Sequence, residues 1–281
     1  QLTLDKLFYS FPIGSQLTVT AGPRVGQEDM LAIWPSFYPS DAILDVLTLN
    51  GAPAAYNKNL GAGAGLRWDA PSGFRLAANY VAANGSRSTT SEGGLATNHA
   101  GSTGTVQMGY AREAWSVAAI YTAIQNGDDL ITYASPFTQA SLSTKGMTHA
   151  FGLGGSWQGL DERWIPSISA GWGINVSDAS HNGDVQTSQS WTAGLEWNNI
   201  FMDGTSAGIA VGQPVFATDL KGDDTPDDGQ FIWEAWLRMN VTDAITVTPA
   251  LFYLSRPLGQ DTPRGETFEQ LGGLAKITFK F

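Results

Sequence analysis

Apolar and polar residues alternate with a period of two along much of the chain. In 191–198, tryptophan, alanine and leucine fill the odd positions, and threonine, glycine, glutamate and asparagine fill the even ones. Related alternations run through 231–240, 245–253 and the closing 276–281, although Pro249 weakens the ladder of one of them. Successive side chains of a β-strand point to opposite faces, so this pattern predicts strands with one apolar and one polar face.

Further segments of the same kind bring the predicted number of strands to about thirteen, in one all-β domain. Turn residues separate them, and the connections fall into two classes that alternate along the chain. Transmembrane antiparallel β-barrels show this asymmetry, because tight turns lie on one side of the membrane and long loops on the other. The further segments begin near Leu4, Gln16, Gly61, Phe74, Gly104, Trp115, Met147, Trp164 and Thr205. Short links are expected at 12–16, 71–73, 112–114, 159–163, 202–204 and 241–243, and long ones at 82–103, 126–146, 177–188, 218–229 and 256–267.

Composition agrees with a membrane barrel. Charged residues make up 15% of the chain and hydrophobic ones 42%, and no apolar run reaches the ~18 residues of a membrane helix. Aromatic residues gather beside the short links, as in the aromatic girdle of a barrel, although aromatic rings also favour β-sheets in general. These aromatics are Phe11, Trp68, Phe74, Trp115, Trp164, Phe201 and Phe281.

Charge and cysteine content exclude several functions. The net charge of −11 makes nucleic acid an improbable partner, and the absence of cysteine excludes disulfides, thiolate metal sites and cysteine nucleophiles. His99, His149 and His181 are not at metal-ligand spacing. The remaining enzymatic alternative pairs His149 with Thr148 or Ser156. We therefore expect no metal, no cofactor and no enzymatic activity.

The link of residues 22–60 is the longest and the most apolar. Ser40 is a candidate N-cap for a helix that carries Ile43, Leu44 and Leu47 at helical spacing and stops at Gly51. A loop of this length and composition is unlikely to extend into solvent. It is expected to fold into the barrel and narrow the pore; the alternatives are an external hydrophobic cap and a subunit contact.

Placing Trp197, Trp233 and Phe281 toward lipid fixes the phase of every strand and turns most strand charges toward the lumen. Arg24, Arg67 and Arg75, facing acidic residues of the long link, are the best candidates for an ion filter. The acidic run 219–228 and the pair 128–129 are expected to be solvated loops without a metal. The candidate pore residues are Arg24, Asp29, Asp41, Asp45, Arg67, Arg75, Glu234, Arg238, Lys276 and Lys280, and the lumen set also includes Lys6, Asp69, Asn79 and Glu196.

Five stretches resemble the carbohydrate-selective porin family, in its cyanobacterial branch of iron-uptake porins. They are Leu4–Gly14, Gly65–Asp69, Trp191–Trp197, Val247–Tyr253 and Leu271–Phe281. Each motif is weak alone, and their order along the chain is fairly specific. The resemblance implies a sixteen-stranded channel in the cyanobacterial outer membrane that passes small solutes and inorganic ions. It also implies a periplasmic domain upstream that binds peptidoglycan.

The direction of the strands adds to this expectation. An odd number of visible strands implies that others are missing, because single-chain bacterial barrels usually have an even number. Three missing strands would make 22–60 the third external loop, which constricts the pore of general porins. We therefore expect 1–281 to be an N-terminally incomplete barrel that contacts outer-membrane lipid and, like many porins, forms a homotrimer. A sugar- or iron-specific channel, a tether between outer membrane and cell wall, and a soluble lectin-like or propeller protein are the alternatives.

Overall fold

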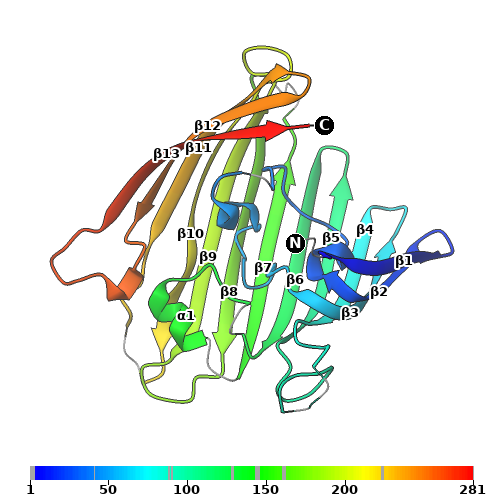
Figure 1. The fold of residues 1–281 in the computed structure, drawn as a ribbon, viewed down its shortest axis with the longest axis vertical. Coiled ribbons are helices and arrows are strands. Elements are labelled where there is room, and N and C mark those ends of the chain that lie inside the picture. The colour runs from blue at the N-terminus through cyan, green and yellow to red at the C-terminus, as the bar shows by residue number, and fades with distance from the viewer. Residues whose placement is uncertain are drawn as a thin grey trace.

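The computed structural model describes residues 4–40, 42–87, 89, 91–127, 130–142, 146–159, 163–222 and 225–280. Its strands form one 13-stranded sheet in which each strand pairs with its neighbours in sequence (Figure 1). Every one of these pairings is antiparallel. The strands are β1 (Leu7–Ile13), β2 (Leu17–Gly26), β3 (Leu60–Asp69), β4 (Phe74–Ala82), β5 (Ser102–Arg112), β6 (Trp115–Gln125), β7 (Met147–Trp157), β8 (Ser167–Ser177), β9 (Val185–Asn198), β10 (Ser206–Leu220), β11 (Phe231–Thr242), β12 (Ile245–Ser255) and β13 (Glu269–Phe279).

The all-β fold and the number of strands confirm the prediction from the alternating pattern. The two classes of connection also follow it, with one departure. The link between β7 and β8, residues 158–166, is longer than the link between β8 and β9, residues 178–184, although the reverse order was expected. Elsewhere tight turns lie at one end of the sheet and longer connections at the other; we call these the turn end and the loop end.

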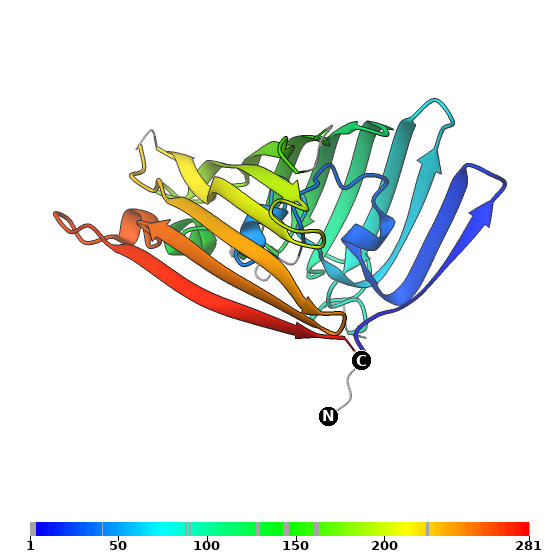
Figure 2. The same cartoon turned by 90° about the horizontal axis from the view of Figure 1, so that it is seen from above.

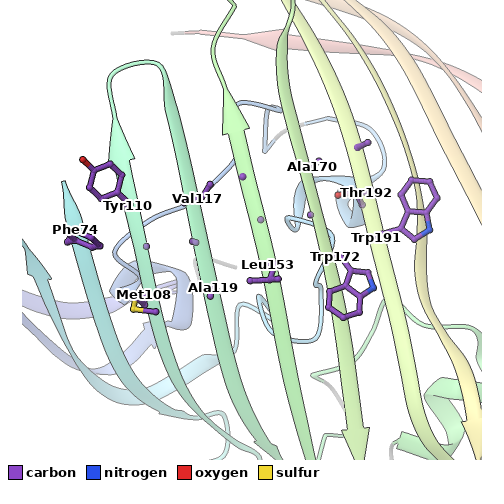
Figure 3. Close-up of a pocket in the computed structure, with 16 residues that line it drawn as sticks. Phe74, Met108, Tyr110, Val117, Ala119, Leu153, Ala170, Trp172, Trp191 and Thr192 are labelled. Carbon is purple, nitrogen blue, oxygen red and sulfur yellow. The ribbon is translucent and has the colours of Figure 1, made fainter. Parts of the chain in front are cut away.

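The convex face of the sheet is apolar. Leu66, Met108, Leu153 and Leu251 are each about half exposed on it, and Phe151 lies between the buried inward positions of its strand. An apolar hollow of about 750 Å³ lies on this face. Figure 3 shows the side chains that line it, among them the ring of Trp172. Alanine and glycine line much of the rest of the hollow. An exposed surface of this character suits lipid and not water. No helix among the described residues is long and apolar enough to cross a membrane.

The phase chosen from the sequence is confirmed for both described tryptophans. Trp233 stacks on Tyr253 with ring centroids 6.1 Å apart, and both belong to the outward rows of β11 and β12. Trp197 lies in the same outward row of β9 as Trp191, which lines the outer hollow. Phe281 lies outside the described residues.

The sheet curves round two connections that lie on its concave side (Figure 2). Loop A is residues 27–59, between β2 and β3, and contains the 3-10 helices η1 (Gln27–Met30) and η2 (Asp45–Thr48). Loop B is residues 126–146, between β6 and β7, and contains the helix α1 (Pro136–Leu142). A third 3-10 helix, η3 (Gly259–Asp261), lies between β12 and β13.

The helix expected from Ser40 to Gly51 is wrong in kind and extent. Only η2 forms there, its N-cap is Leu44, and no side chain caps it. The reason is tertiary, because the backbone N–H of Leu44 donates to a carboxylate oxygen of Glu234 on β11 at 2.5 Å, so the wall of the sheet satisfies this amide. The predicted stop is close to correct, since Asn50 and Gly51 both have positive φ, at 53° and 68°.

Candidate pore constriction

Loop A is seated on a row of glycines on the concave face. A Cβ atom on Gly171 of β8 would lie 1.8 Å from the carbonyl oxygen of Asn50, and one on Gly51 would lie 2.0 Å from the carbonyl oxygen of Gly171. Gly173 meets Ala52, and Gly194 of β9 meets the ring of Tyr38 in the same way. The loop and the wall therefore approach backbone to backbone, at distances that side chains would prevent.

Two glutamines replace the hydrogen bonds that a strand partner would have supplied to this loop. Gln27 is fully buried and donates to the carbonyl of Ala55 and to the hydroxyl of Thr105, both at 2.8 Å. Gln107 on β5 accepts from the backbone N–H groups of Ala32 and Ile33, both at 3.0 Å. Buried peptide groups need such partners, so these amides stabilise an irregular segment against the wall.

Glu234 anchors the far side of the loop. It is completely buried and accepts from the hydroxyl of Tyr38 at 2.6 Å, in addition to the amide of Leu44. The same hydroxyl accepts from the indole N–H of Trp236 at 2.8 Å. Burial, and then the charge and hydrogen bond of Glu234, raise the pKa of Tyr38 far above its ordinary value, so the phenol remains a donor. Glu234 points inward as predicted, but it lies under loop A and not against an open passage.

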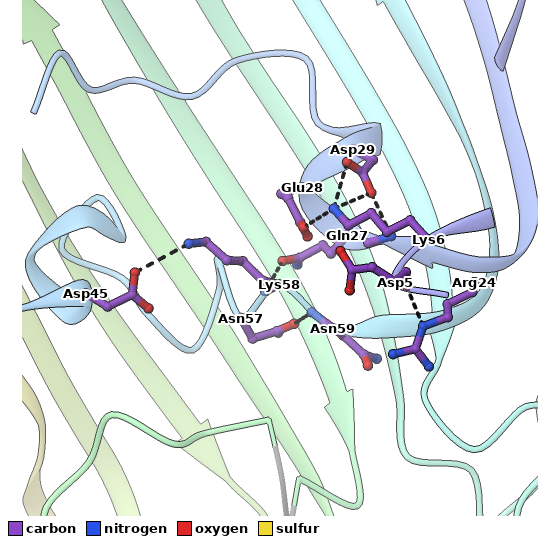
Figure 4. Close-up of polar contacts among 11 residues, drawn as sticks. Asp5, Lys6, Arg24, Gln27, Glu28, Asp29, Asp45, Asn57, Lys58 and Asn59 are labelled. Carbon is purple, nitrogen blue, oxygen red and sulfur yellow. Dashed lines mark hydrogen bonds and ion pairs between the residues drawn. The ribbon is translucent and has the colours of Figure 1, made fainter. Parts of the chain in front are cut away.

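The acidic residues of loop A have local partners (Figure 4). Lys6 lies 2.8 Å from Asp29 and 2.7 Å from Glu28. Asp45 lies 3.8 Å from Lys58, accepts from the hydroxyl of Tyr133, and is exposed. Burial, followed by the Asp45 hydrogen bond and charge, raises the pKa of Tyr133 to about 12. Asp41 lies outside the described residues.

The expected pairing of arginines with loop A differs from the contacts observed. Arg67 and Arg75 both bind Asp69, at 2.9 and 3.4 Å, and Arg24 donates to the carbonyl of Asp5 at 2.5 Å. Asp69 lies on β3 with Arg67 and pairs in register with Arg75 on β4, whereas Asp5 precedes β1. Arg75 does reach loop A, but through the carbonyl of Ala32, to which it donates at 3.3 Å, and not through a carboxylate. Arg67 and Asp29 do line one small cavity, of about 110 Å³, so part of the expected juxtaposition exists.

The other inward charges lie toward the turn end. Arg238 stacks on Trp236, with the guanidinium 5.1 Å from the ring. Lys276 pairs in register with Thr248, whose side chain is buried on the concave side, and Lys280 is exposed beyond the end of β13. Glu196 lies on the inward row of β9. Asn79 is buried on β4, and both polar atoms of its side chain lack a hydrogen-bond partner in the described part of the chain.

Loop B was missed by reading the sequence. We expected a polar external loop, yet Leu130, Ile131 and Leu142 are buried in one cluster with Tyr56 of loop A and with wall residues such as Ile124. Tyr133 packs with a second cluster that contains Tyr38 and Leu47 of loop A. Two buried clusters therefore each join both loops to the wall.

The acidic run 219–228 does not behave uniformly. Asp227 is exposed and binds Arg256 at 2.9 Å, as a solvated loop residue would. Asp228 is 1% exposed, so the solvated interpretation is wrong for this residue. Asp223, Asp224, Asp128 and Asp129 lie outside the described residues. Among those described, no cluster of three metal-ligating side chains occurs.

His149 and Ser156, which the enzymatic alternative would pair, lie on opposite faces of the sheet. His149 bonds to the hydroxyl of Tyr121 at 2.8 Å, and both belong to the outward rows of their strands. Ser156 belongs to the inward row and bonds to Ser116 at 2.9 Å. The thickness of the sheet separates the supposed base from the supposed nucleophile.

No known family profile and no curated protein matches the sequence. Solved structures do. An anion-selective porin from Comamonas acidovorans superposes with a TM-score of 0.60 at 11% identity, over 94% of this chain and 74% of that one. OprB from Pseudomonas putida gives 0.61 at 14%, over 98% and 71%. OmpF from Salmonella typhi, in a complex with daunomycin, gives 0.56 at 11%, over 96% and 77%.

This chain has the porin fold. At such identities the likeness is one of fold, and it agrees with the sheet, the apolar convex face and the inward loop already described. The neighbours are bacterial outer-membrane porins, which are passive channels and not enzymes.

Proposed function

We propose that the chain forms the wall of an outer-membrane channel through which small hydrophilic solutes and inorganic ions diffuse passively. The observation that carries the proposal is a sheet with an apolar convex face whose concave face is crossed by a firmly seated loop. Lipid would cover the first face, and the second would border a passage narrowed by loop A. In this proposal residues 1–281 are one barrel domain and the long connection of 22–60 is its constriction.

The direction of the edge strands supports a larger barrel. Since every neighbouring pair is antiparallel, β1 and β13 run in the same direction and cannot close on one another antiparallel. An odd number of further strands would allow closure, and three would give the sixteen expected from the sequence.

Selectivity in this proposal comes from charges around the passage. Asp45 and Lys58 would present opposite charges at the edge of loop A, and the arginines that bind Asp69 would lie nearer the turn end. A narrow aperture screens charges poorly, so such groups act on passing ions. The proposed set is Arg24, Asp29, Asp41, Asp45, Arg67, Arg75, Glu234, Arg238, Lys276 and Lys280, with Glu234 acting through the position of loop A.

Reconstitution tests this function. The full-length protein placed in a planar bilayer should give open channels whose current is proportional to voltage. Currents at the level of protein-free bilayers, from protein that is folded in detergent, would contradict the proposal.

The motifs that resemble the cyanobacterial carbohydrate-selective and iron-uptake family favour a second candidate, a channel specific for sugars or an iron species. Saturable block of the current by one such solute would support it over general diffusion.

The same resemblance is the basis for proposing a homotrimer and an upstream domain that binds peptidoglycan. The mass of the detergent-solubilised assembly and sedimentation with purified cell wall test these two points. If deletion loosens the envelope and leaves solute uptake unchanged, the chain is a tether.

A further inference from the structure

The buried carboxylate of Asp228 links three elements at the loop end of the sheet. One oxygen accepts from the hydroxyls of Ser135 and Thr138, at 2.7 and 2.6 Å, and from the backbone N–H of Ala217 at 2.7 Å. The other accepts from the backbone N–H of Gln260 at 3.0 Å. The donors belong to loop B, to β10 and to η3. A buried carboxylate with four donors is held firmly, because each donor would otherwise lose a charge-assisted bond.

The segment that Asp228 holds also pairs with the wall. The carbonyl of Tyr133 accepts from the N–H of Val215 at 2.8 Å, and the N–H of Ser135 donates to the carbonyl of Val215 at 3.0 Å. Ala134 and Val215 thus form a short parallel bridge. The side chain of Tyr133 extends from this bridge to the carboxylate of Asp45 on loop A.

Loop B therefore reaches the exposed edge of loop A at Asp45, the residue that also faces Lys58. Lys58 is held there by its own backbone, with φ at +53° and its N–H bonded to Gln27 at 3.1 Å. A left-handed lysine persists only where surrounding contacts fix it. The edge of the aperture is thus built from three residues of two loops, Lys58, Asp45 and Tyr133.

We propose that loop B borders the aperture together with loop A, and that Asp228 is the positioning residue that holds loop B there. Tyr133 orients the carboxylate of Asp45 through its hydrogen bond, so both the width and the ion preference of the passage depend on a carboxylate at the loop end. The inference rests on the proposed channel function and deepens it.

Two neighbouring aspartates provide a matched test. In Asp228→Ala, four donors lose their acceptor, and hydrogen exchange of residues 130–142 should become at least about tenfold faster. Open-channel current in a planar bilayer should rise, and larger neutral polymers should enter the pore. Asp227→Asn, one residue away and exposed, should match the unaltered protein in all three measurements. Equal exchange, current and polymer cut-off in the two variants would overturn the proposal.

Tyr133→Phe removes one hydroxyl and leaves the carboxylate network intact, so it decides the matter if Asp228→Ala does not fold. With its donor gone, Asp45 should attract cations more strongly, and the reversal potential in a salt gradient should shift toward cation preference. An unchanged reversal potential would overturn the role given to loop B. If the unaltered protein forms no channel, the diffusion function itself fails, and faster exchange in Asp228→Ala alone would then report a structural contact and not an aperture.

Discussion

Loop A and loop B occupy the same interior, yet different contacts dominate in each. Loop A lies on positions that have no side chain, such as Gly171, so its backbone touches the backbone of the wall, and Glu234 adds an anchor at its far side. Loop B packs in a buried cluster and pairs with Val215, and two of its hydroxyls converge on the carboxylate of Asp228. The difference teaches that an irregular segment can be fixed inside a barrel either by shape or by a buried charge. A segment fixed by shape should be displaced when atoms are added to the wall, and a segment fixed by a buried charge when the charged group is removed.

The largest effect is expected where a side chain is added to a wall glycine that contacts loop A. In Gly171→Ala the new methyl group would collide with the carbonyl of Asn50, which is backbone and cannot rotate away. We expect a loss of about 3 kcal/mol in the free energy of unfolding, at the upper end of overpacking costs. Denaturant unfolding of the full-length protein in detergent measures it. Gly104→Ala is the control, because a Cβ there meets nothing within 4 Å; equal losses in the two variants would contradict a steric seat.

A smaller loss is expected at the charged anchor of loop A. Tyr38→Phe removes the donor to Glu234 and the acceptor for Trp236, and should cost about 2 kcal/mol because buried groups are left unpaired. Glu234→Gln should cost a similar amount, since the amide nitrogen that replaces one carboxylate oxygen is not an acceptor and leaves either Tyr38 or Leu44 without its partner. A double-mutant cycle measures the coupling. Strictly additive losses would mean that this bond contributes nothing of its own.

The smallest effect is expected at the exposed Asp227, which precedes the buried Asp228 in sequence and binds Arg256. The hydrogen bond from Arg256, and then its charge, hold the pKa of Asp227 below the ordinary value. A lowered pKa gives stability that is present above the unfolded pKa and is lost as the pH falls below about 4. Asp227→Asn should therefore cost about 0.5 kcal/mol at neutral pH and less at pH 3, as solvent screens exposed pairs. Comparing the unfolding free energies of the two proteins at both pH values checks the sign.

The strands could be predicted because alternation is a local property. The odd row of 191–198 faces outward in the structure for the same reason that it is recognisable in the sequence. Loop A is recognisable in the sequence as an unusual connection because its apolar residues are concentrated in one long stretch. Its helix is not, because Leu44 takes its hydrogen-bond partner from β11, about 190 positions along the chain.

Loop B carries no comparable signal. Its apolar residues lie between Leu130 and Leu142, in a stretch flanked by polar residues and interrupted by Pro136, so the link as a whole resembles the other polar links. In sequence Asp228 looks like any other member of an acidic run, and only its hydroxyl and amide donors distinguish it from Asp227. The arginine partners could not be assigned either, because both neighbouring strands and loop A offered carboxylates within reach.

The glycines under loop A have a consequence for how chains with this fold can diverge. A glycine can be replaced only by a residue with more atoms, so the wall glycines that contact loop A should tolerate few substitutions. The exposed edge of the same loop, where Asp45 and Lys58 lie, is free of that restriction. Among descendants of this chain, we expect substitutions to accumulate along that edge, and these would alter permeability under the proposed channel function, while Gly51, Gly171 and Gly173 remain invariant.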